Sequence, residues 1–274
     1  MRIGFFGDVV GKAGREAIVN YVNLNKSVYK LDFVIVNAEN AAHGFGITQK
    51  ICDQLFEAGV DAITLGNHTF DQKDDMQLFD REMRLVRPLN YPAGTPGKGF
   101  RVIDIKNSGK RVLVINLIGR LFMEYNDDPF RAITVLLSDY ELGKKKSIDA
   151  IIIDFHAEAT AEKSALARYL DGKVTAVVGT HTHIPTADLQ ILKNGTGYLS
   201  DCGMCGDYDS VIGMDDVASI MRFTQKIHAF GKMQPAQKEA TVCGVIIDVA
   251  DNGLCENMQT VRVGGYLLEQ KDCV

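Results

Sequence analysis

The distribution of apolar and polar residues along the chain predicts strands that alternate with helices. Short apolar runs at Ile3–Phe6, Phe33–Val36 and Ala62–Leu65 are typical of buried strands. Between them, Ala13–Val22 and Ile47–Ala58 have the apolar spacing of helices that pack on a sheet by one face. This order predicts βα units, in which a helix connects each strand to the next.

The rest of the chain adds hairpins to further buried strands. Phe100–Ile105 and Arg111–Leu117 alternate apolar and polar residues around a turn at Asn107–Lys110, and Asp251–Gly253 is a turn signal for a last hairpin. Further strands are expected at Ala150–Phe155, Val174–Val178, Leu189–Leu192, Gly197–Ser200, Val242–Val249 and Met258–Val263, and further helices at Thr160–Leu170 and Asp215–Ile227. Because no linker or repeat interrupts the pattern, we expect one α/β domain spanning residues 1–274, in which two stacked mixed sheets are plausible.

Composition restricts the classes of function. The chain has 274 residues, of which 46% are hydrophobic and 24% charged, and this balance is typical of a soluble globular protein. The net charge of −5 disfavours binding to long nucleic acids or to an anionic membrane. No apolar stretch is long enough to span a membrane, and Asp8 interrupts the short apolar N-terminus too early for a signal peptide. We therefore expect a cytoplasmic protein.

The six cysteines are scattered, and some lie within apolar runs. This pattern predicts reduced, mostly structural thiols rather than a disulfide framework. Cys202 and Cys205 form a C-x-x-C pair, but no second pair or suitable histidine pair follows at zinc-finger spacing. A zinc or redox role for this pair is therefore the less favoured interpretation.

Five of the predicted strands end in residues that are able to bind a metal ion. In chain order these residues are Asp8, then Glu39 and Asn40, then Asn67 and His68, then His156, then His181 and His183. The densest segment is Gly179–His183, which holds two of the six histidines at the mouth of a buried strand. Because sites in open α/β sheets form beyond the carboxyl ends of the strands, we expect these side chains to meet.

Each of these residues also has an ordinary structural explanation. Asp8 could cap the next helix, Asn40 and Asn67 could serve in turns, and His156 could be a hydrogen-bonded core histidine. Independent caps and turns do not explain so many histidines, acids and asparagines at successive strand ends. A mixture of nitrogen and oxygen ligands without thiolates suits two cations that share a carboxylate bridge.

The same residues form an ordered set of motifs that resembles the calcineurin-like metallophosphoesterases. The motifs are G-D-x-x-G at Gly7–Gly11, N-A-E-N at Asn37–Asn40, G-N-H at Gly66–His68, D-F-H at Asp154–His156 and G-T-H-T-H at Gly179–His183. The resemblance covers essentially the whole chain and is closest to the YmdB-type branch, whose members hydrolyse 2′,3′-cyclic nucleotides. It implies the calcineurin-like fold, with two stacked mixed β-sheets flanked by helices.

Two departures from the wider superfamily select this branch. Val10 stands where most members have the histidine of a D-x-H motif, and Glu39 replaces the usual bridging aspartate. In the YmdB-type branch both departures are expected, with Asn40 in the vacated position. The resemblance implies that Asp8, Glu39, Asn40 and His183 bind one metal and that Glu39, Asn67, His156 and His181 bind the other. Iron or manganese is expected, with zinc or magnesium as alternatives.

The resemblance also implies a mechanism. A hydroxide that bridges the two metals attacks phosphorus, and His68 protonates the leaving ribose oxygen as the general acid, which yields a 3′-nucleotide. The partner is then a small cyclic nucleotide or another phosphodiester, and relatives suggest self-association. His43 could contact substrate or serve only in its loop. Asp154 and Asp201 could orient the ligand histidines.

Two other functions remain open on the sequence. The same site could act on a phosphomonoester, a phosphoprotein or another cyclic nucleotide. Alternatively, the chain could be a regulatory nucleotide-binding or RNA-linked protein in which hydrolysis is incidental. The presence of His68 favours catalysis, and the lack of a basic stripe disfavours tight binding to long RNA.

Overall fold

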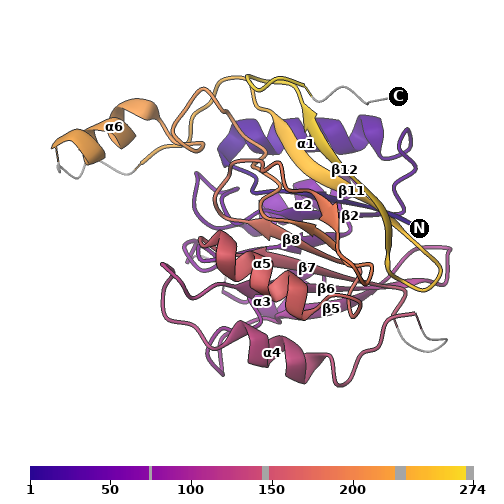
Figure 1. Cartoon of the computed structure of the whole chain (residues 1–274). Coiled ribbons are helices and arrows are strands. Elements are labelled where there is room, and N and C mark those ends of the chain that lie inside the picture. Colours follow the sequence, from indigo (N-terminus) through magenta and orange to yellow (C-terminus); the bar gives the residue numbers. More distant parts are fainter. Residues whose placement is uncertain (74–75, 144–147, 226–232, 270–274) are drawn as a thin grey trace.

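The computed structural model describes residues 1–73, 76–143, 148–225 and 233–269, which form two six-stranded sheets (Figure 1). The first sheet has the order β12-β11-β1-β2-β3-β4 and the second has the order β5-β6-β7-β8-β10-β9. The first comprises β1 (Arg2–Phe6), β2 (Phe33–Asn37), β3 (Ala62–Thr64), β4 (Leu85–Val86), β11 (Val242–Val249) and β12 (Cys255–Val263). The second comprises β5 (Phe100–Asp104), β6 (Arg111–Ile118), β7 (Ala150–His156), β8 (Ala176–Thr180), β9 (Gln190–Ile191) and β10 (Gly197–Leu199).

Both sheets are mixed, as the sequence predicts. Strands β1 to β4 are parallel to one another, and β11 and β12 extend that sheet as an antiparallel hairpin. In the second sheet β6, β7, β8 and β10 are parallel, whereas β5 and β9 are antiparallel edge strands. The parallel strands of each sheet therefore end at a common edge, where their connecting loops begin.

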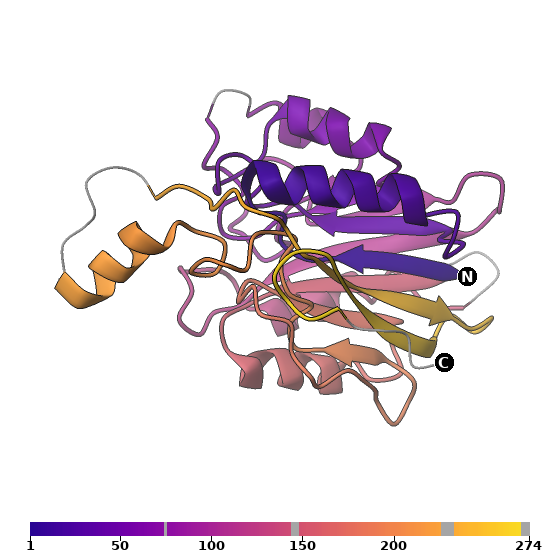
Figure 2. The same ribbon diagram turned by 90° about the horizontal axis from the view of Figure 1, so that it is seen from above.

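Alternating side chains divide the molecule into four layers. Ile3 and Phe5 of β1 share one buried cluster with Val112 and Val114 of β6, so the two sheets pack face to face. The residues at alternate positions point outward and pack under helices. The described helices are α1 (Gly11–Asn25), α2 (Gln49–Glu57), α3 (Leu78–Arg81), α4 (Pro129–Leu136), α5 (Thr160–Tyr169) and α6 (Asp216–Gln225). Helices α1 and α2 cover the first sheet, and α4 and α5 cover the second (Figures 1 and 2).

The sequence pattern missed three elements and misplaced the ends of others. Helices α3 and α4 and strand β4 were not predicted. Helix α4 has a readable signal, because Asp128 accepts hydrogen bonds from the backbone nitrogens of Phe130 and Arg131, and Pro129 occupies the first turn. The strand predicted at Val174–Val178 begins and ends two residues later. The last two residues of the helix predicted at Asp215–Ile227 lie outside the described residues. None of the described helices is long and apolar enough to cross a membrane.

The space between the sheets becomes polar at the edge where the parallel strands end. Asn37, Asp154 and Thr180 continue the inward-facing positions of their strands, and all three are completely buried. Buried polar groups need partners. Asn37 Nδ2 donates to Asp154 Oδ2 at 2.8 Å, and Thr180 Oγ1 donates to Asp154 Oδ1 at 2.6 Å. Asp154 therefore ties the end of β2 in one sheet to β7 and β8 in the other.

A buried ion pair holds the loop that follows β8. Lys163 Nζ, on α5, donates to the carbonyl oxygen of Thr180 at 2.8 Å and to Asp201 Oδ2 at 3.0 Å. Asp201 also accepts hydrogen bonds from the backbone and hydroxyl of Thr182 and from the backbone of Gly203. Both charged side chains are 1% exposed. The ion pair thus fixes the backbone that carries His181 and His183.

Removing Asp201 should therefore destabilise the protein strongly. We expect Asp201→Ala to lower the free energy of unfolding by about 3–5 kcal/mol, because the charge of Lys163 is left buried without its partner. Urea denaturation measures the loss. The double variant Lys163→Met/Asp201→Leu removes both charges and should recover most of it. A loss below about 1 kcal/mol in the single variant would contradict this role of the ion pair.

Candidate metal centre

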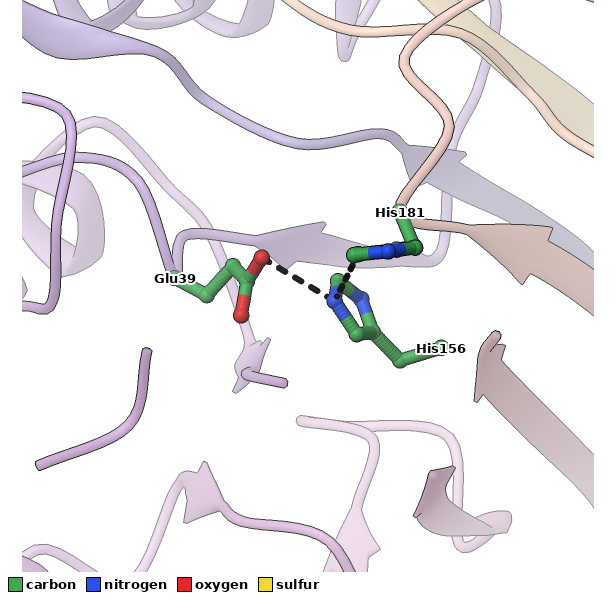
Figure 3. Close-up of side chains that lie close together, drawn as sticks. All are labelled: Glu39, His156 and His181. Carbon is green, nitrogen blue, oxygen red and sulfur yellow. Dashed lines mark hydrogen bonds and ion pairs between the residues drawn. The ribbon is translucent and has the colours of Figure 1, made fainter. Parts of the chain in front are cut away.

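Three side chains from both sheets converge at the edge where the parallel strands end (Figure 3). His156 is the last residue of β7, Glu39 follows β2 and His181 follows β8. His156 Nε2 lies 3.0 Å from Glu39 Oε1 and 3.0 Å from His181 Nδ1. One ligand atom from each residue falls within 4.8 Å of the other two. Such a group has the composition and spacing of a metal-binding cluster.

Asn67 and Asp8 extend this cluster. Asn67 Oδ1 lies 3.0 Å from His156 Nε2. Asp8 Oδ1 lies 3.8 Å from His156 Nδ1, while Asp8 Oδ2 lies 3.9 Å from His183 Nε2 and accepts a hydrogen bond from the backbone of His181. Asp8 therefore stands between His156 and His183, and residues that follow or end five strands meet at one place.

Asn40 is on the same edge but has a different environment. Its Nδ2 donates to the carbonyl oxygen of Gly44 at 2.9 Å, so the side chain does serve in a turn. Its Oδ1 is buried and has no hydrogen-bond partner among the described residues, and the same is true of Asp8 Oδ1. The backbone nitrogen of Gly11 donates to the carbonyl of Asn40, which keeps the two loops together. These two orphaned oxygens are acceptors that a cation would satisfy.

The helix-cap explanation of Asp8 fails. Helix α1 begins at Gly11 with Val10 as its N-cap, and no side chain caps it. The core explanation of His156 is incomplete, because its Nε2 faces oxygen and nitrogen acceptors rather than apolar groups. The composition of this cluster therefore fits a bound cation better than it fits either structural role.

The backbone conformation after β8 turns its two histidines toward different groups. His181 has φ of 94° and His183 has φ of 67°, a left-handed region that few non-glycine residues adopt. His181 Nδ1 contacts His156, whereas His183 Nε2 faces Asp8. Close approach also requires Gly66, because a Cβ at that position would lie 2.4 Å from Glu39 Oε2 and from His156 Nε2. The arrangement thus depends on strained backbone at the two histidines and on glycine at position 66.

Partners outside the cluster orient each histidine ring. Thr180 Oγ1 donates to Asp154, so the same oxygen accepts from His156 Nδ1 at 3.0 Å, which leaves Nε2 as the ring nitrogen that faces the cluster. His183 Nδ1 donates to the carbonyl of Ile212 at 2.8 Å. His181 Nε2 lies 3.2 Å from Glu158 Oε2, which leaves its Nδ1 for the cluster.

Sequence reasoning identified only part of this outer set. Asp154 does orient His156, although it acts through Thr180. Asp201 holds the backbone at Thr182 and is hydrogen-bonded to none of the candidate-ligand histidines. Thr180 and Glu158 were missed. The inward-facing alternation of β8 is a signal that could have found Thr180, whereas no local pattern marks Glu158.

The electrostatics of the cluster favour a positive charge at its centre. Burial raises the pKa of Asp8. Burial opposes ionisation of Glu39 as well, but the adjacent His156 outweighs it and lowers the pKa of Glu39 to about 2. Burial disfavours a charged His156, yet Glu39 and Asp8 raise its pKa to about 9. Burial and the neighbouring His156 lower the pKa of His181 to about 3. The acids thus stabilise one cation here, a charge that a metal ion would supply.

His68 lies beside the cluster. Its backbone nitrogen donates to Glu39 Oε2 at 3.0 Å, and its ring Nδ1 lies 2.8 Å from Asp71 Oδ2. The ring packs edge to face on Phe45, with 5.0 Å between the centroids. His68 therefore lies next to the candidate ligands, and its ring is held by Asp71, which is not one of them.

Two further predictions concern residues away from the cluster. His43 is exposed, in a left-handed turn, and its role remains a prediction. Cys52, Cys202, Cys205, Cys243 and Cys255 are free and buried, which confirms the prediction of unpaired thiols for the cysteines that the structure describes. Cys273 lies outside those residues. Cys202 and Cys205 do not belong to the metal-binding cluster.

Comparison with known proteins supports the motif-based interpretation. The sequence pattern of the YmdB-like protein family matches residues 5–261. The chain is 48% identical over 251 residues to a Bacillus subtilis (strain 168) protein named 2′,3′-cyclic-nucleotide 2′-phosphodiesterase. That match covers 92% of this chain and 92% of the relative.

Solved structures give the same result. A hypothetical protein from Thermus thermophilus has a TM-score of 0.88 and 39% sequence identity, over 97% of this chain and 100% of the other. A structure from Mycoplasma pneumoniae, described as a novel phosphatase, has a TM-score of 0.87 and 37% identity, over 96% of this chain and 93% of the other. The predicted metallophosphoesterase fold is confirmed, and the chain belongs to the YmdB-like protein family.

Proposed function

We propose that this protein is a metal-dependent phosphodiesterase that hydrolyses 2′,3′-cyclic nucleotides to 3′-nucleotides. The observation that carries the proposal is the convergence of Glu39, His156 and His181, with acceptor atoms turned toward one point and the orphaned Asp8 Oδ1 nearby. The name of the Bacillus subtilis relative supports the enzyme class, a phosphoric diester hydrolase. Beyond this class, we propose the substrate, the regiochemistry of its hydrolysis and the metals.

Two groups of residues would hold two metal ions. Asp8, Asn40 and His183 would bind one ion; Asn67, His156 and His181 would bind the other; Glu39 would bridge them. The donors fit this division, because His183 Nε2 faces Asp8 whereas His156 Nε2 lies 3.0 Å from Asn67 Oδ1 and 3.0 Å from His181 Nδ1. Nitrogen and oxygen donors without thiolates are compatible with iron or manganese. Such ions would supply an activated water and would offset charge on the phosphoryl oxygens.

His68 would then act as the general acid. When the ring is protonated, Nδ1–H donates to Asp71, and the second proton on Nε2 is available to the leaving ribose oxygen. The hydrogen bond from its backbone to Glu39 keeps the ring beside the ligands. Asp71 and Phe45 restrict the ring further.

A phosphomonoester is the alternative substrate with specific support. The Mycoplasma pneumoniae structure with 37% identity is described as a phosphatase. A phosphomonoester would present the same phosphoryl group to the same residues, so the candidate ligands alone do not separate the two reactions. Product analysis separates them.

His68→Ala should abolish most turnover and leave metal binding intact. For 2′,3′-cyclic AMP we expect kcat to fall by about 10²–10⁴-fold, because the leaving alkoxide no longer receives a proton. Metal content is measured on the same sample by elemental analysis. A p-nitrophenyl phosphodiester has a leaving group that needs no proton, and its hydrolysis should fall much less. Equal losses on both substrates would contradict the general-acid role.

Thr180→Val should weaken the centre without removing a candidate ligand. The variant loses the oxygen that links His156 to Asp154, so we expect metal affinity or kcat to fall by about 10- to 100-fold. Thr180→Ser keeps the hydroxyl and should restore both. Thr175, at the other end of the same strand region, is equally buried, so Thr175→Val is the matched control and should leave metal affinity unchanged. Wild-type metal affinity and kcat in Thr180→Val would refute this orienting role.

The substrate itself is decided by a hydrolysis panel. We expect the manganese- or iron-loaded protein to convert 2′,3′-cyclic AMP to adenosine 3′-phosphate, identified by chromatography against the 2′-isomer. The panel also contains 3′,5′-cyclic AMP, a cyclic dinucleotide and adenosine 3′-phosphate. Faster release of inorganic phosphate from the monoester than ring opening of the cyclic substrate would favour the phosphatase alternative.

A further inference from the structure

A cavity of about 650 Å³ lies next to His68 and has no part in the candidate metal centre. Its walls include His43, Phe45, Asp71, Gln72, Arg222 and Met233. Two of these residues contact His68 directly, because Phe45 packs on the imidazole ring and Asp71 lies 2.8 Å from its Nδ1. The ring of His68 therefore lies against two residues that line this cavity, while its backbone nitrogen donates to Glu39 of the candidate cluster.

The same two loops build both the cluster and the cavity. One loop carries Glu39 to the cluster and, a few residues later, His43 and Phe45 to the cavity. The other carries Asn67 to the cluster and then Asp71 to the cavity. The conformation of these two loops thus positions both the candidate ligands and two walls of the cavity.

Hydrogen bonds hold these two loops to each other. Gln72 Nε2, on the second loop, donates to the carbonyl oxygen of Phe45 on the first at 2.6 Å. Gly46 has φ of 78°, and a Cβ there would lie 3.0 Å from Gln72 Cγ, so the loops approach closely. The contacts between the two loops therefore hold Phe45 and Asp71 in place as walls of the cavity.

The third wall comes from a distant part of the chain. Helix α6 extends away from the two sheets (Figure 1). On this helix, Arg222 contacts Met233 with 3.8 Å between Nη1 and Sδ. Both side chains line the cavity together with Phe45. The segment that leads to α6 also holds the ligand loop, since Ile212 accepts the hydrogen bond from His183.

We propose that this cavity binds the nucleobase of the substrate, an inference that rests on the proposed function. With phosphorus at the metal centre and the leaving oxygen at His68, the ribose extends past His68 toward Phe45 and Asp71. The base attached to that ribose then lies in the cavity. The volume is within the range of sites for small organic ligands.

The lining suits an uncharged aromatic ring. Phe45, the guanidinium plane of Arg222 and the thioether of Met233 offer surfaces for stacking, and the amide of Gln72 borders them. Asp71 would repel a second phosphate placed near it, which disfavours a cyclic dinucleotide in this orientation. The cavity thereby selects a mononucleotide by its base, beyond the phosphodiester chemistry itself.

The test compares two cyclic phosphodiesters that differ only in the base. The substrates are 2′,3′-cyclic AMP and 1-O-methylribose 2,3-cyclic phosphate, and the readout is the ratio of their kcat/KM values. We expect the ratio to exceed one in the wild type and to fall about tenfold in Arg222→Ala, because one face of the base loses its contact. Arg131 is an exposed arginine on α4 that does not line this cavity, so Arg131→Ala is the matched control and should leave the ratio unchanged.

A direct binding measurement is independent of hydrolysis. Saturation-transfer NMR with adenosine should show transfer to the adenine protons in the wild type and a clear reduction in Arg222→Ala. If 2′,3′-cyclic AMP is hydrolysed but its kcat/KM ratio is the same in the wild type and Arg222→Ala, the cavity proposal is overturned and the proposed function stands. If neither cyclic substrate is hydrolysed, the proposed function fails. The adenosine measurement then decides the cavity, and absence of transfer overturns it.

Discussion

Polar side chains buried between two sheets must find partners there, and this constraint organises the molecule. At the edge where the parallel strands end, Asp154 accepts from Asn37 of the first sheet and from Thr180 of the second. The bond from Asn37 crosses between the sheets and the bond from Thr180 links neighbouring strands of the second sheet, so together they fix how the two carboxyl edges meet. The candidate metal ligands stand directly on this layer, because His156 follows Asp154 by two residues and shares its inward face.

The centre is a product of orientation as much as of residue type. Each of the three candidate-ligand histidines has its far nitrogen occupied: His156 by Thr180, His181 by Glu158 and His183 by the carbonyl of Ile212. The other ring nitrogens therefore point inward, where acids stabilise a positive charge. Left-handed backbone at His181 and His183 allows the two histidines to face different groups although they are two positions apart. The ion pair of Lys163 with Asp201 supports the loop in that conformation.

Loops that supply ligands also shape what lies next to them. The segments after β2 and β3 each reach the cluster first and the cavity beside His68 second. Because the same two loops contribute to both places, a shift of either loop would disturb the candidate metal centre and the cavity together. Helix α6 adds a wall from a part of the chain that contributes no candidate ligand.

Most strands, the mixed α/β architecture and the family could be predicted from the sequence, because apolar periodicity and ordered motifs are local properties. The sequence also contains a helix N-cap residue, Asp128, from which α4 could have been predicted. By contrast, α3 and β4 are too short for any periodic signal. Only the tertiary structure decided the rest. Asn37 and Asp154 are 117 residues apart, and Thr180, Glu158 and Arg222 acquire their neighbours through sheet packing and loop conformation. Contacts of that kind depend on how strands are stacked in space, which no local pattern of residues specifies.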